Sequence, residues 1–145
     1  MAGTSSGGDG GEGAALVPEI IDENLVVDCT LEAPEDPVSG GLTAQYDNKK
    51  GASPATATLL SCQLVMDAGP NKLTWSFDAT PAQVAVEAGA LETVEHVKTP
   101  GSGVGSGIGE PCDYCFKSWH LAAKWSIDGE IKSASSDPEG IFCEQ

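Results

Sequence analysis

Residues 118–135, SWHLAAKWSIDGEIKSAS, decide the fold class of this chain. Apolar side chains stand at every second position from Trp119 to Ile127, with mostly polar or small residues between them, which is the period of a half-buried β-strand. Asp128 and Gly129 then supply a two-residue connection with type I′ chemistry, whose twist matches that of paired strands. The stretch therefore predicts an antiparallel hairpin.

The same alternation recurs elsewhere in the chain and predicts further strands. One runs from Leu25 to about residue 31 and ends in a loop rich in proline and glycine. A second hairpin is expected from two alternating runs joined by the turn DAGPN, and a short strand is expected near the C-terminus. These expected strands cover residues 55–66, 72–77 and 141–143. Six or more short strands predict a mainly β fold, an antiparallel β-sandwich or barrel.

One region fits two structures. Thr80, followed by a proline and by a glutamine three positions on, matches the start of a helix. Gly89 and the β-branched valines before it disfavour a helix. We therefore expect two short strands, 83–88 and 91–97, with one short helix near 81–97 as the alternative.

Two segments lack the large apolar side chains of a core. Residues 1–16 contain mainly glycine, serine and alanine with scattered acids, and predict a flexible arm, either without a role or ordered on a neighbouring subunit. Residues 99–111 carry glycine at every second position from 101 to 109, and predict a Gly-rich loop. Its bare face would also allow another backbone to approach closely. The expected organisation is this arm followed by a single β domain, residues 17–145.

The charge balance excludes several classes of partner. The 145 residues include 22 acidic and 7 basic side chains, the basic ones are all lysine, and the net charge is -15. Such a chain repels nucleic-acid phosphates and has no arginine fork to bind them, so we expect no nucleic-acid partner. No apolar stretch is long enough to span a bilayer, and the N-terminus lacks the pattern of a signal peptide, so we expect no membrane insertion.

The five cysteines are the main chemical signal. Cys29 and Cys62 lie on the apolar sides of their expected strands, and are interpreted either as small buried side chains or as a disulfide between facing sheets. Cys112 and Cys115 form a CxxC pair. This pair indicates either ordinary thiols or one local disulfide such as Cys115 with Cys143, with a zinc site as the alternative.

The candidate zinc ligands are Cys112, Cys115, Cys143 and His120, with His96 as an alternative to His120. A redox role for the CxxC pair is disfavoured, because it does not open a helix after a strand. We therefore expect no cofactor, with zinc as a possibility.

No pattern of catalytic residues is present. G-x-S-x-G, G-x-G-x-x-G and an EF-hand loop are all missing, so we expect no catalytic residue and no nucleotide site. The three tryptophans, Trp75, Trp119 and Trp125, could line a sugar-binding face, but their alternation with aliphatic residues is typical of a core.

These observations predict a non-enzymatic structural or assembly protein. The expected partners are other proteins or further copies of the chain, so a homo-oligomer or larger assembly is expected. A virion component such as a capsid decoration or tail protein has this combination of small size, acidic surface and extended arm. The alternatives are a secreted or cell-surface binding module held by disulfides and a small zinc-stabilised interaction domain. The expected location is the virion or the extracellular space.

Overall fold

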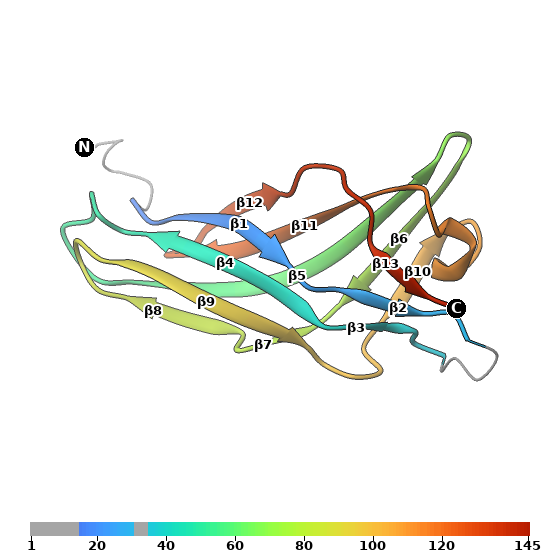
Figure 1. Cartoon of the computed structure of the whole chain (residues 1–145). Helices are drawn as coiled ribbons and strands as arrows, with labels where there is room; N and C mark the ends of the chain where they lie inside the picture. Colours follow the sequence, from blue (N-terminus) through green and yellow to red (C-terminus); the bar gives the residue numbers. More distant parts are fainter. Residues whose placement is uncertain (1–14, 31–34) are drawn as a thin grey trace.

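The structure, a computed structural model, describes residues 15–30 and 35–145. Strands dominate these residues and form two larger sheets and one small sheet (Figure 1). The predicted mainly β, antiparallel fold is confirmed. In each larger sheet the first and last strands are not paired with each other, so neither sheet closes on itself. The two sheets therefore form an open sandwich and not a closed barrel.

The first larger sheet has four antiparallel strands in the order β1-β4-β9-β7. Strand β4 buries Leu42, Ala44 and Tyr46 on one face, because alternate residues of a strand point to the same side. Strands β1 and β4 were not among the strands predicted from the sequence. The strands are β1 (Val17–Glu23), β4 (Gly41–Asp47), β9 (Leu91–Lys98) and β7 (Ala79–Thr80).

The second larger sheet contains both predicted hairpins. Its order is β10-β6-β5-β11-β12, and β8 pairs with the first part of β5. In the β11–β12 hairpin, Asp128 and Gly129 have φ angles of 50° and 84°, as a type I′ turn requires. The strands are β10 (Val104–Gly107), β6 (Asn71–Phe77), β5 (Ala55–Ala68), β11 (Ser118–Ile127), β12 (Glu130–Ser135) and β8 (Gln83–Val86).

The region that fitted either a helix or two strands forms strands β8 and β9. The expectation of two strands is confirmed, and a helix near 81–97 is wrong. Val84 and Val86 alternate into the core from β8, which a helix would not allow. Gly89, with a φ of 77°, turns the chain between the two strands.

The glycine-rich stretch 99–111 is not simply a loop, because it contains β10. The bare face of β10 covers the indole of Trp75, which is buried although β6 lies next to the edge of the sheet. A Cβ at Gly105 would lie 2.9 Å from Cζ3 of Trp75. We expected residues 99–111 to form a loop, or to let another part of the chain approach closely. The structure shows the close approach.

The predicted boundary of the N-terminal arm at residue 16 is too late. Leu16 is fully buried, and its carbonyl oxygen accepts a hydrogen bond of 2.9 Å from Nζ of Lys132 in β12. Residues 1–14 of the predicted arm lie outside the described residues.

The three tryptophans belong to the core, as their alternation predicted. Trp119 and Trp125 are fully buried, and Trp75 is 6% exposed. The indole nitrogen of Trp125, on β11, donates a hydrogen bond of 3.0 Å to the hydroxyl of Tyr46, on β4. This contact joins the inner faces of the two larger sheets.

The small third sheet lies toward one end of the sandwich, near the C-terminus (Figure 1). Its order is β13-β2-β3, with β13 parallel to β2 and β3 antiparallel to it. The strands are β13 (Phe142–Glu144), β2 (Val26–Asp28) and β3 (Val38–Ser39). This sheet brings the C-terminal cysteine beside the one that follows β2.

Candidate functional site

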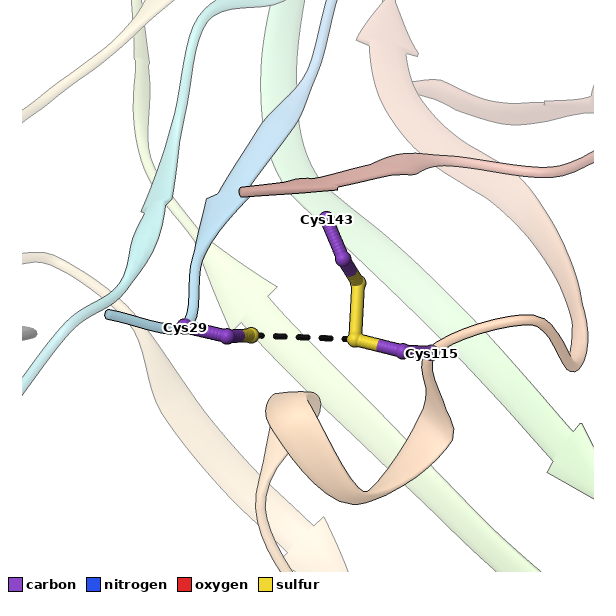
Figure 2. Close-up of side chains that lie close together, drawn as sticks. All are labelled: Cys29, Cys115 and Cys143. Carbon is purple, nitrogen blue, oxygen red and sulfur yellow. Dashed lines mark hydrogen bonds between the residues drawn. A yellow bond between two sulfur atoms is a disulfide. The ribbon is translucent and has the colours of Figure 1, made fainter. Parts of the chain in front are cut away.

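Four cysteines from three separate parts of the chain meet at this end of the sandwich, which we call the cysteine end. Cys29 follows β2, and Cys143 lies in β13. Cys112 and Cys115 belong to a short 3-10 turn, η2 (Pro111–Tyr114), and to the residue directly after it. Figure 2 shows Cys29, Cys115 and Cys143 converging from their three segments.

Two disulfides join these segments, Cys29 with Cys112 and Cys115 with Cys143. The local disulfide proposed from the sequence, Cys115 with Cys143, is therefore present. The alternative pairing of Cys29 with Cys62 is not formed. Cys62 is a buried free thiol between the sheets, opposite Phe77 in β6, whereas Cys29 lies beyond the end of its strand.

The predicted zinc ligands are brought together only in part. The sulfur atoms of Cys29, Cys115 and Cys143 lie within 4.8 Å of one another, and Cys112 is bonded to Cys29. His120 is not in this group. It follows the inward-facing Trp119 on β11, so its side chain points to the opposite face of the sheet. Cys29 is the member of the cluster that the predicted ligand set lacked.

Contacts other than the disulfides hold the η2 turn in place. The carboxylate of Asp113 accepts a hydrogen bond of 2.9 Å from the backbone of Glu110. The hydroxyl of Tyr114 donates a hydrogen bond of 2.6 Å to the carbonyl of Ile108. The backbone carbonyl of Tyr114 accepts a hydrogen bond of 2.8 Å from the indole of Trp119. Tyr114 is buried, so the turn is anchored in the core.

Two phenylalanines beside the second disulfide are exposed. Phe116 follows Cys115 and is 88% exposed, and Phe142 precedes Cys143 and is 64% exposed. Phe116 also has a φ of 67°, a conformation that bulky residues rarely adopt. Neither phenylalanine was predicted to be functional from the sequence, although the position of each next to a cysteine was a readable signal.

A second polar centre lies where the 35–39 segment meets β9. Asp36 and Lys98 form an ion pair with side chains 9% and 1% exposed. Asp36 also accepts hydrogen bonds from the indole of Trp75 at 3.1 Å and the backbone of Gly103 at 2.8 Å. Burial raises the pKa of the Asp36 carboxyl, but hydrogen bonds from Lys98, Gly103 and Trp75 outweigh it, and the pKa lies below its ordinary value.

The cleft beside this ion pair is lined by Val38, Ser39, Pro100 and Gly101, among others. Asp36 and Lys98 line it as well, but both carboxylate oxygens of Asp36 accept hydrogen bonds from the protein itself. The ion pair thus links the 35–39 segment to β9.

A third polar group lies inside the core. The hydroxyl of Tyr46 donates to Nε2 of His96 at 2.6 Å, while Nδ1 of His96 donates to the carbonyl of Pro81 at 2.8 Å. A carbonyl can only accept, so neutral His96 has its proton on Nδ1, and its Nε2 is then the acceptor for the Tyr46 hydroxyl. Burial lowers the pKa of His96 and raises that of Tyr46 to about 12. His96, the alternative zinc ligand, has both ring nitrogens occupied within the core.

Comparison with family models, curated proteins and solved structures found no match to this chain. Among the described residues, no helix has the length and apolar character needed to cross a bilayer.

Proposed function

We propose that this chain is a non-enzymatic binding module of an oxidising, extracellular compartment, and that it meets a protein partner through the cysteine end. The observation that carries the proposal is the pair of disulfides, which joins three chain segments and has an exposed phenylalanine next to each cysteine of the second disulfide. Disulfides persist mainly outside the cytosol. Rigidly mounted aromatic side chains supply contact area at low entropic cost, and aromatics are enriched in interface hot spots.

The charges near the phenylalanines define the partner that would fit. Glu110, Asp113 and Glu144 are exposed and belong to the same two segments, which carry one exposed lysine, Lys117, so acidic side chains predominate there. A protein that offers an apolar pocket flanked by basic side chains would complement this end in both shape and charge. Its association rate would decrease as ionic strength rises.

The first test counts free thiols by intact mass in denaturant, after production in an oxidising compartment. The proposal expects one thiol, that of Cys62, because the other four cysteines are paired. Five free thiols would contradict it.

The second test concerns self-association, the case in which the partner is another copy of the chain. Light scattering after size-exclusion chromatography would be run over a range of concentrations on the wild type and on the double variant Phe116→Ser with Phe142→Ser. Ile131→Ser, which removes an exposed apolar side chain from β12, is the matched control. Oligomers that the double variant loses and the control keeps would support assembly through the cysteine end. A monomer at all concentrations would eliminate self-assembly.

The virion component predicted from the sequence is the narrower, assembly form of this proposal. Its support is the small size, the net charge of -15 and the β architecture. The self-association test decides whether this form is retained.

A further inference from the structure

We propose that the four cysteines of the cysteine end have a second state, in which the reduced thiolates together bind one Zn²⁺ as a site of four sulfur ligands. This inference does not depend on the proposed binding function. It concerns the chain before oxidation or after reduction, and it differs from the ligand set predicted from the sequence by using Cys29 in place of His120.

The first argument is the spacing of the sulfur atoms. In a tetrahedral zinc site with Zn–S bonds of about 2.3 Å, the sulfur atoms lie about 3.8 Å apart. The sulfurs of Cys29 and Cys115, which belong to different disulfides, are 3.7 Å apart (Figure 2). Cys143 completes a group of three sulfurs within 4.8 Å, and Cys112 is bonded to Cys29. Three sulfurs therefore lie close enough together to share one ion, and the fourth is bonded to one of these three.

The second argument is that the backbones of these cysteines are held independently of the disulfides. The backbone nitrogen of Cys29 donates to the carbonyl of Glu144 at 2.6 Å, and Cys143 pairs with Val27 in the parallel β13–β2 ladder. The CxxC pair lies on the η2 turn, which is anchored by Tyr114 and by the hydrogen bond between Glu110 and Asp113. Opening the disulfides leaves these contacts intact, so the ligands stay near one another.

The third argument is that this combination of ligands occurs once in the described structure. Among residues 15–30 and 35–145, no other group of three or more histidine, cysteine or acidic side chains is placed to share an ion. The C-x2-C spacing and thiolate ligands are those of structural zinc sites. The fifth cysteine, Cys62, is buried between the sheets and takes no part.

The oxidised chain reaches the zinc-bound state by reduction followed by metal binding. A dithiol reductant supplies two electrons and two protons to each protein disulfide and becomes a disulfide itself. The four resulting thiols then release four protons to solvent as Zn²⁺ binds their thiolates. The same sulfurs cannot bind the ion while they are paired, so oxidation and zinc binding exclude each other.

The test uses the full chain, reduced with a dithiol, incubated with Zn²⁺ and freed of excess metal and reductant without exposure to air. Elemental analysis is expected to find one zinc per reduced chain and none per oxidised chain. Co²⁺ in place of Zn²⁺ is expected to give the visible absorption of a tetrahedral thiolate complex. Tryptophan fluorescence reports whether the reduced chain is folded, and zinc is expected to restore the native emission if reduction alone alters it.

Three variants assign the ligands. Cys143→Ser is expected to lose the bound zinc, whereas Cys62→Ser and His120→Ala are expected to keep it. Less than one zinc per reduced wild-type chain, whether that chain is folded or unfolded, would overturn the proposal. Loss of zinc from Cys62→Ser or His120→Ala equal to that from Cys143→Ser would overturn the ligand assignment and the proposal with it.

Discussion

The carboxylate of Asp36 connects parts of the chain that are distant in sequence. Lys98 lies at the end of β9, Trp75 in the middle of β6, and Gly103 just before β10. Asp36 could not be identified from the sequence, because no local pattern distinguishes it from the other acidic residues among the 22. Only the fold brings a lysine, an indole and a backbone amide to the same carboxylate.

We predict that Asp36→Asn strongly destabilises the protein. The substitution leaves the ammonium group of Lys98 buried without a counter-charge, which typically costs about 3–5 kcal/mol. Urea denaturation followed by tryptophan fluorescence measures the change. Asp67→Asn, which removes an exposed partner of Lys72, is the matched control and is expected to change stability little. Similar small effects of both substitutions would show that the buried pair contributes no more than the exposed one.

His96 predicts a dependence of stability on pH. Burial lowers the pKa of His96 in the folded state below the value of 6.5 that it has when exposed. Below about pH 6.5 the unfolded chain therefore binds a proton that the folded chain does not, and stability falls as the pH decreases from there. One pH unit below that point, the loss due to this group amounts to as much as about 1.4 kcal/mol.

The contribution of His96 can be isolated by comparing the wild type with His96→Gln. Free energies of unfolding would be measured for both at several values between about pH 5.5 and pH 7.5. The variant is expected to be less stable at neutral pH but to have the shallower slope. Equal slopes would show that groups other than His96 cause the pH dependence.

At the scale of single elements, alternation was sufficient where strands have one buried face and unambiguous turns. The β11–β12 hairpin ends at the residues predicted for it, because Asp128 and Gly129 fix both the turn and the register. Strand β4 also alternates, with Leu42, Ala44 and Tyr46 facing inward, so it could have been predicted. Strand β1 could not, because it is an edge strand that contains a proline and several exposed acids.

Strand β10 gives a prediction about the function of its glycines. We expect Gly105→Ala to destabilise the protein by about 1–3 kcal/mol, because the added methyl group overlaps Trp75 and cannot be accommodated without displacing it. Gly140→Ala is the matched control, since a Cβ at Gly140 meets no atom within 4 Å. Denaturant titration and the wavelength of tryptophan emission would report the two effects. Equal stability of the two variants would mean that β10 does not pack on Trp75.

At the scale of the whole molecule, the cysteines show where prediction from sequence stops. The spacing of Cys112 and Cys115 marked this segment as chemically distinct, and the pairing of Cys115 with Cys143 was among the possibilities. The pairing of Cys29 with Cys112 depends on the contact between the residue after β2 and the η2 turn, 83 positions further along the chain. Sequence periodicity describes each strand separately and contains no information on such a contact.

The two disulfides are expected to contribute unequally to stability. In the chain-entropy model, a disulfide stabilises the fold by restricting the unfolded state, and the effect grows with the length of the loop it closes. Cys29 and Cys112 are separated by 83 positions, and Cys115 and Cys143 by 28. Replacing the first pair by serine should therefore cost about 1 kcal/mol more than replacing the second.

The comparison requires urea denaturation of the oxidised wild type and of each double serine variant. Repeating it with a reductant and a chelator provides the control, because both disulfides are then open and the contribution from loop closure disappears from every chain. A difference that persists under reduction would come from the substituted side chains in the folded state. A larger loss from the 115–143 pair would instead indicate that local order around the η2 turn, and not loop length, determines what each disulfide contributes.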